Sequence, residues 1–289
     1  MLLIVNPAAG RAGAAGGRVE LARRVLADHA EPAVIALTER PGHARDLARA
    51  ALADGVRRIV AWGGDGTVNE VASVLASTPA ALGIVPSGSG NGLARTLNLP
   101  RAPEDALSTA LRGTPRAIDM GEMNGRLFVN IAGLGLDAEV AERFNDPRNV
   151  RRGLGGYVRI VARALLACKT IRCTIDAGGA ERQARPLLVA FANGPQYGNG
   201  IRIAPDARVD DGRLDMVIVE ERSRAATMRQ LPRLVCGGIG RSPDWRLQTI
   251  TEARITADTP MALHVDGEPL NRGSTAQVRV LPGVLKVVV

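Results

Sequence analysis

One short run of the chain combines the residue types that phosphate chemistry needs: Gly63-Gly64-Asp65-Gly66-Thr67. Glycines let the backbone approach a phosphate closely, and a helix that begins in such a turn attracts an anion. The Asp65 carboxylate could hold Mg²⁺ or take a proton, while Thr67 could cap the helix and donate to a phosphate oxygen. An ordinary tight turn in which Asp65 is only a helix cap is the alternative, because a single Gly-rich motif is a weak signal.

The stretches on both sides of this run alternate between two hydrophobic periodicities. Continuous apolar stretches predict buried strands, and apolar residues three and four apart predict helices. The predicted strands are residues 2–5, 33–37, 58–62 and 81–85, and the predicted helices are residues 19–30, 43–53, 68–75 and 103–111. This alternation predicts a doubly wound, Rossmann-like α/β domain with a parallel sheet.

Ligands bind such sheets at the carboxyl ends of the strands. Four candidate turns follow predicted strands there: residues 6–10, Thr38, residues 63–69 and residues 86–91. Any one of them could be purely structural. Four at the same edge favour a phosphate-binding crevice.

The pattern changes near residue 113, where short strands separated by turns replace the alternation. Strands are predicted at residues 117–123, 126–131, 171–175, 186–192, 214–219, 254–257, 261–265 and 275–280, with one helix at 154–166. Many such strands are typical of an antiparallel β-sandwich. We therefore expect two domains, an α/β domain over residues 1–115 and an all-β domain over residues 116–283. The last residues, 284–289, are candidates to complete the first domain.

Two groups of acids in the second domain lie beside glycines. Asp210-Asp211-Gly212 is either an ordinary hairpin turn or part of a site for a hard cation. In Asp266-Gly267-Glu268, either acid could take a substrate proton or coordinate Mg²⁺. His264 is expected on the same strand face as Asp266, although a lone His is more often structural.

The composition limits the classes of binding partner to be expected. The formal charge of +8 favours an anionic partner, with an Arg-rich genome as the alternative explanation, and the aromatic content of 2% argues against a nucleic acid. The three cysteines lack CxxC spacing, so neither a disulfide framework nor a zinc site is expected. The cysteine usage also favours a reducing cytoplasm. We find no signal peptide and no apolar run long enough to span a membrane, so we expect a soluble protein that at most associates transiently with a membrane surface.

In their order and spacing, the motifs together resemble the diacylglycerol kinase and sphingosine kinase superfamily, in particular its bacterial lipid kinases. The resemblance covers nearly the whole chain. It rests on Asn6-Pro7-x-x-Gly10, on Gly63 to Glu70, on Pro86-x-Gly88-Ser89-Gly90-Asn91, on Asn193-Gly194 with Tyr197-Gly198-x-Gly200, on Ala204-Pro205-x-Ala207, on Asp211-Gly212-x-Leu214-Asp215, and on Asp266-Gly267-Glu268. One departure is Gly92, where many bacterial members carry an acid; the Gly88-Ser89-Gly90-Asn91 form is similar to that of sphingosine kinases.

The resemblance implies an NAD kinase-like first domain and an ATP-dependent lipid kinase that phosphorylates the hydroxyl of a diacylglycerol-like or sphingoid-like membrane lipid. ATP and Mg²⁺ are the implied cofactors, and the lipid at an anionic membrane surface is the implied partner. A homodimer is left open. An NAD kinase-like phosphotransferase and a catalytically silent nucleotide or lipid sensor are the alternatives.

Carried over by position, the resemblance implies Glu268 as proton acceptor, with Asp65 in the phosphate and magnesium network. A structural Mg²⁺ would use the Asp211 carboxylate and the backbone carbonyls of Arg208 and Arg213. The implied ATP contacts are Asn6, Pro7, Ala8, Ala9, Gly10, Thr38, Gly63, Gly64, Asp65, Gly66, Thr67, Val68, Asn69 and Ser89.

Overall fold

The computed structural model describes residues 1–10, 15–145, 160, 163–165, 170–198, 201–220 and 245–289. The chain forms two compact units, Met1–Asp119 with Pro282–Val289, and Met120–Leu281. We call them unit 1 and unit 2. The division lies inside one strand, β5 (Pro115–Met123), close to the expected boundary at 115/116.

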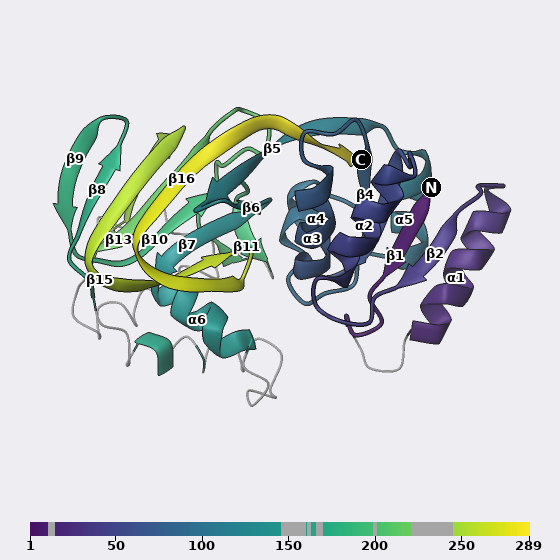
Figure 1. The fold of residues 1–289 in the computed structure, drawn as a ribbon, viewed down its shortest axis with the longest axis horizontal. Coiled ribbons are helices and arrows are strands. Elements are labelled where there is room, and N and C mark those ends of the chain that lie inside the picture. The colour runs from purple at the N-terminus through teal and green to yellow at the C-terminus, as the bar shows by residue number, and fades with distance from the viewer. Residues whose placement is uncertain (11–14, 146–159, 161–162, 166–169, 199–200, 221–244) are drawn as a thin grey trace. The chain divides into compact units, whose positions relative to one another are not determined.

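Unit 1 contains a parallel sheet in the order β16-β4-β3-β1-β2 (Figure 1). Its strands are β1 (Leu2–Val5), β2 (Val34–Leu37), β3 (Arg58–Gly63), β4 (Ala81–Pro86) and the end of β16 (Glu268–Val288). Lys286 and Val287 of β16 pair in parallel with Ala81 and Leu82 of β4. Because β1 pairs with both β2 and β3, the chain reverses its direction across the sheet between β1 and β3.

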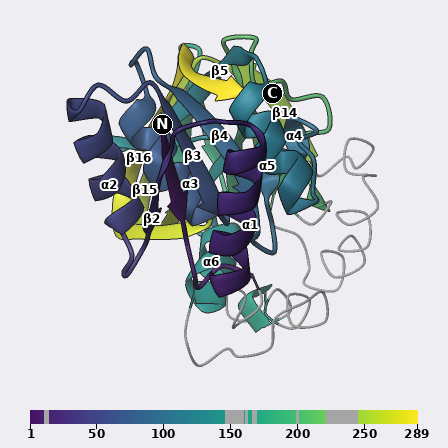
Figure 2. The same cartoon turned by 90° about the vertical axis from the view of Figure 1, so that its right-hand side faces the viewer.

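Helices cover both faces of this sheet. They are α1 (Ala15–Asp28), α2 (His43–Ala53), α3 (Asp65–Leu75), α4 (Gly92–Thr96) and α5 (Pro103–Arg112). Figure 2 shows α1 and α5 on one side of the strands and α2 on the other. Between α1, α5 and the sheet lies a core that includes Leu3, Val60 and Trp62, all at most 1% exposed. The predicted doubly wound arrangement is confirmed.

Unit 2 is an antiparallel β-sandwich, as predicted. Its elements are β6 (Arg126–Phe128), β7 (Ile131–Gly135), α6 (Leu136–Asn145), β8 (Cys173–Ala177), β9 (Ala180–Ala184), β10 (Pro186–Ala192), β11 (Gln196–Gly198), β12 (Ile201–Arg202), β13 (Leu214–Glu220), β14 (Trp245–Ile250), β15 (Glu252–Val265) and most of β16. One ladder runs β14-β13-β10-β7-β15-β16, and β8 and β9 form a hairpin beside β15.

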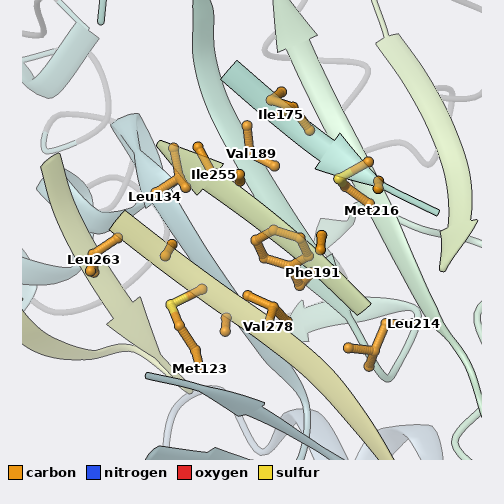
Figure 3. Close-up of a cluster of buried hydrophobic side chains, with 14 of the residues drawn as sticks. Met123, Leu134, Ile175, Val189, Phe191, Leu214, Met216, Ile255, Leu263 and Val278 are labelled. Carbon is orange, nitrogen blue, oxygen red and sulfur yellow. The ribbon is translucent and has the colours of Figure 1, made fainter. Parts of the chain in front are cut away.

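β10 is buried on both faces, which explains why its sequence is apolar throughout rather than alternating. Val189 and Phe191 point into the large core between the strands, which Figure 3 shows. Leu188, Ala190 and Ala192 point into a second core, to which α6 contributes. A strand that is buried on both faces reads as a continuous hydrophobic run.

β15 joins the two layers of the sandwich. Its first part, around Ile255, pairs with β8, whereas Leu263, His264 and Val265 pair with β7. The register with β16 shifts between Thr256 and Met261, a bulge of the kind that lets one strand pass between sheets. β15 therefore carries the last residues before the Asp266 turn into contact with β7.

Several expectations differ from the structure or fall outside it. The helix predicted at 154–166 lies largely outside the described residues. The expectation of a single helix in the second domain is wrong, because α6 is a helix of ten residues. β9 and β14 were also missed, since most of their side chains are exposed and their sequences lack an apolar stretch. Among the described residues, no helix is long and apolar enough to cross a membrane.

Candidate functional site

In unit 1, a hydrogen bond joins the loop after β1 to the start of α3. The Asn6 Nδ2 donates to the Thr67 Oγ1 at 2.9 Å, and the Asn6 Oδ1 accepts the backbone N–H of Ala8 at 2.9 Å. The two loops follow β1 and β3, between which the chain changes direction. That is the position at which open α/β sheets bind their ligands.

Glycines let three loops of unit 1 pack backbone against backbone. A Cβ on Gly88 would lie 2.7 Å from the Gly64 Cα, and one on Gly10 would lie 2.7 Å from the Ser87 carbonyl oxygen. A Cβ on Gly63 would lie 2.5 Å from Thr67. Approaches this close exclude any side chain, so the loops after β1, β3 and β4 form one assembly at the carboxyl edge of the sheet.

Asp65 fastens the loop after β4 to the start of α3. Its Oδ2 accepts the backbone N–H of Asn91 at 2.8 Å, and its Oδ1 accepts that of Gly92 at 2.7 Å. Burial raises the pKa of Asp65, and the two backbone bonds oppose that rise. α3 itself begins at Gly64 without a side-chain cap, so the expectation that Thr67 caps this helix is wrong.

The other expected nucleotide residues differ in their surroundings. Thr38 is buried beside the end of β1, where its N–H donates to the Val5 carbonyl. Ser89 is exposed. Val68 and Asn69 are buried within α3, and the Asn69 Oδ1 accepts the Ser73 hydroxyl at 3.3 Å. Val68 is a core residue, and its only polar groups are those of its backbone.

Sequence reasoning gave no role to Glu70. Its carboxylate accepts the N–H groups of Gly42 and Arg45, at 2.8 Å and 3.4 Å, at the start of α2. It thus replaces the missing side-chain cap of that helix. An acid in the second turn of α3 has no local sequence signal for a bond to a segment some 28 residues earlier.

In unit 2, Asp266 and Gly267 form the turn between β15 and β16. Both residues have positive φ, 47° and 82°, and Val265 pairs with Glu268 across the turn. The Asp266 carboxylate accepts three backbone N–H groups, from Val129 at 2.8 Å, Asn130 at 2.9 Å and Ile131 at 3.0 Å. Asp266 is thus committed to holding the backbone, whereas Glu268 is exposed.

Sequence reasoning also missed the partners of His264. Its Nε2 lies 3.1 Å from the Asp137 Oδ2, and the Tyr197 hydroxyl donates to the same oxygen at 3.1 Å. Asp137 follows the Gly-x-Gly pattern that ends β7, which is a weak signal of a functional acid. Nothing local indicates its contact with a residue 127 positions later.

The proposed metal ligands lie in the turn before β13. The Asp211 Oδ1 accepts the backbone N–H of Arg213 at 3.1 Å, and Gly212 has φ 71°. β13 pairs with β10 and β14, so the hairpin interpretation of this turn is wrong. Burial raises the pKa of Asp215, and the nearby charges of Asp211 and Asp206 raise it further. No group of three or more His, Cys, Asp or Glu side chains in the described part of the chain could hold a metal.

Known families match both units. The diacylglycerol kinase catalytic domain matches residues 1–123, and the YegS C-terminal NAD kinase beta sandwich-like domain matches residues 130–289. The chain belongs to the diacylglycerol kinase and sphingosine kinase superfamily. The superfamily resemblance inferred from the motifs is therefore confirmed.

Relatives within this superfamily cover nearly the full chain. A protein of Serratia proteamaculans named "Probable lipid kinase YegS-like" is 32% identical, over 99% of this chain and 92% of its own. One of the same name from Pseudomonas aeruginosa is 34% identical over 88% and 83%. A crystal structure from Bacillus anthracis, whose protein is assigned to the diacylglycerol kinases, has a TM-score of 0.83 and 27% identity over 99% of this chain and 96% of its own.

Asp266→Ala is predicted to destabilise the protein by about 2–4 kcal/mol, because three backbone N–H groups lose their acceptor at once. Urea unfolding followed by circular dichroism measures this change. Glu252→Ala is the matched control, since Glu252 is an exposed acid on β15. Equal stability of the two variants would contradict the bonding described for Asp266.

Proposed function

We propose that this chain is an ATP-dependent lipid kinase that phosphorylates the hydroxyl of a diacylglycerol-like or sphingoid-like membrane lipid. The observation that carries the proposal is the close assembly of three glycine loops at the carboxyl edge of the unit 1 sheet, in a chain of this superfamily. A kinase of this family uses ATP. Phosphoryl transfer is largely a matter of positioning and charge stabilisation, which such loops supply.

The nucleotide contacts would come mainly from backbone. Gly63, at the buried end of β3, and Gly64 and Gly66 would offer N–H groups without a Cβ in the way, and α3 begins among them. Asn6 and Thr67 hold two of the loops in register through their mutual hydrogen bond. The remaining contacts of the proposed set are Pro7, Ala8, Ala9, Gly10, Thr38, Val68, Asn69 and Ser89.

Glu268 is the proton acceptor we favour in unit 2. Of the two acids at the β15–β16 turn, Asp266 already accepts three backbone N–H groups, which occupy its carboxylate oxygens. Glu268 is exposed and is the first residue of β16. An exposed carboxylate on a paired strand can meet a lipid hydroxyl and take its proton.

Magnesium would have oxygen ligands in each unit. In unit 1, each Asp65 oxygen keeps acceptor capacity beyond its backbone bond, so Asp65 can take part in a phosphate and magnesium network. In unit 2, the Asp211 carboxylate and the carbonyls of Arg208 and Arg213 would supply the oxygen ligands, in the negative field that also acts on Asp215. A bound Mg²⁺ would neutralise phosphate charge in the first place and stabilise the turn in the second.

The acceptor is expected at a membrane surface. The formal charge of +8 favours association with anionic lipid, within the reach of electrostatic attraction. A hydroxyl on a diacylglycerol-like or sphingoid-like lipid is presented at such a surface. These properties support a lipid acceptor over a soluble one.

The direct test offers radiolabelled ATP and Mg²⁺ to the purified protein with a total lipid extract, followed by identification of the labelled lipid. We expect one lipid class to be labelled, and Glu268→Gln to reduce the rate by roughly a hundredfold through loss of the base. Glu252→Gln is the control and should keep the wild-type rate. Absence of label in every lipid, with NADP formed from NAD instead, would replace the lipid kinase with an NAD kinase.

Asp65→Asn is expected to lower turnover by roughly tenfold or more while the fold survives, because the amide keeps one acceptor but turns its NH₂ toward a backbone donor. Turnover and melting temperature are measured together. Asp105→Asn, on the surface of α5, is the control. A wild-type rate in Asp65→Asn would remove Asp65 from the proposed site.

Asp211→Asn is expected to abolish most of the rise in melting temperature that Mg²⁺ gives the wild-type protein, since it weakens the only charged ligand of the proposed unit 2 site. Differential scanning fluorimetry without nucleotide, with and without about 5 mM MgCl₂, measures the shift. Glu181→Gln on β9 serves as control. An equal Mg²⁺ shift in Asp211→Asn would exclude this site.

A further inference from the structure

Directly before the turn that carries Glu268, His264 is buried in contact with a buried acid. His264 is 2% exposed, and the side chain of Asp137 is 8% exposed. Their Nε2 and Oδ2 atoms lie 3.1 Å apart. We call them the Asp137–His264 pair. Tyr197 donates to the same Asp137 oxygen, and the Asp137 Oδ1 accepts the N–H of Ala138 at the start of α6.

The other side of the His264 ring determines its tautomer. The Gly267 backbone N–H donates to the Nδ1 at 3.3 Å. A backbone N–H can only donate, so the Nδ1 must be the acceptor and the neutral ring carries its hydrogen on the Nε2. The Nε2 then donates to Asp137. The ring therefore connects a buried carboxylate to the backbone of the turn, two residues before Asp266 and four before Glu268.

The strand beside His264 is built to admit this contact. Gly133 of β7 lies opposite His264 in the ladder. A Cβ on Gly133 would lie 2.0 Å from the Asp137 Oδ2 and 3.0 Å from the His264 Nε2. Only glycine leaves room there for the carboxylate to reach the imidazole. The contact thus depends on three separate positions of the sequence.

The turn is consequently held at both of its central residues. The Asp266 carboxylate binds the N–H groups of residues 129–131, and His264 binds the N–H of Gly267. The bond to His264 acts on Gly267, the residue adjacent to Glu268, and restrains the peptide that sets the direction of the Glu268 side chain. A misplacement of about 1 Å in a catalytic group can cost roughly a hundredfold in rate.

We propose that the Asp137–His264 pair is a positioning device for Glu268, which acts by holding the Gly267 N–H and with it the start of β16. This inference rests on the proposed lipid kinase function. His264 and Asp137 are positioning residues here, since neither touches the transferred group.

Two substitutions separate the two ends of the imidazole. In His264→Asn, the amide oxygen can take the place of the Nδ1 and accept the Gly267 N–H, while the contact with Asp137 is lost. In His264→Gln, the amide NH₂ can take the place of the Nε2 and donate to Asp137, while the Gly267 N–H loses this acceptor. His264→Ala removes both. His29→Asn, in unit 1 beside Ser108, is the control.

The variants are compared in the full chain, with radiolabelled ATP and anionic phospholipid vesicles that contain diacylglycerol or sphingosine. We expect His264→Ala and His264→Gln to lower kcat roughly tenfold or more, with the KM for ATP within about twofold. His264→Asn should fall between these variants and wild type, because it keeps an acceptor for the Gly267 N–H but loses the contact with Asp137. A wild-type rate in His264→Asn would remove Asp137 from the positioning device. Amide hydrogen exchange of Gly267, measured by NMR, should accelerate roughly tenfold in the Ala and Gln variants and stay slow in the Asn variant.

A His264→Gln variant as active as wild type would overturn the proposal, because the contact with Asp137 would then be sufficient. Unchanged Gly267 exchange in His264→Ala would overturn it as well. If the wild-type protein labels neither lipid, and none in the total extract, the lipid kinase function itself fails. Gly267 exchange would still decide whether the Asp137–His264 pair holds the turn.

Discussion

Much of this structure depends on backbone N–H groups that have no acceptor within a strand or helix. Carboxylate side chains accept hydrogen bonds from these groups. Such a group loses its water when a loop packs closely, and leaving it without an acceptor is costly. Asp65 accepts two of them at the start of α4, Glu70 two at the start of α2, and Asp266 three after β6. The Asp119 Oδ1 accepts that of Gly283, where β16 returns to unit 1. Loops fixed in this way can approach one another as closely as glycines allow.

This constraint distinguishes acids that hold the backbone through several donors from acids whose side chains are exposed. Asp266 and Glu268 lie two residues apart beside the same glycine, and their types alone do not distinguish them. The first carboxylate is surrounded by donors and the second is exposed on a strand. Asp65 is intermediate, since its two oxygens each hold one backbone donor and keep further acceptor capacity. A structural and a chemical role are compatible in that residue.

Local sequence patterns predicted the fold well. The four predicted strands of unit 1 and most strands of unit 2 are continuous or alternating apolar runs, and the glycine motifs follow strand ends, so periodicity and turn chemistry were sufficient for these elements. α6 was missed although its sequence carries helix signals, because Asp137 and Glu139 in its first turn are typical of a helix start. β14 was missed because four of its six residues are exposed. Its strand conformation follows from pairing with β13 rather than from its own sequence.

The candidate sites could be predicted from the sequence less well than the fold, because most of their hydrogen bonds join residues far apart in the chain. The turn at Asp266 could be predicted as a turn, but the donors that occupy its carboxylate come from residues 129–131. Likewise, an isolated His gives no indication of Asp137, and only the pairing of β7 with β15 brings the two together. Sequence motifs locate the groups that chemistry would use. The register of the sheets then decides which distant groups each side chain meets, and at this turn it brings the N–H groups of residues 129–131 to Asp266.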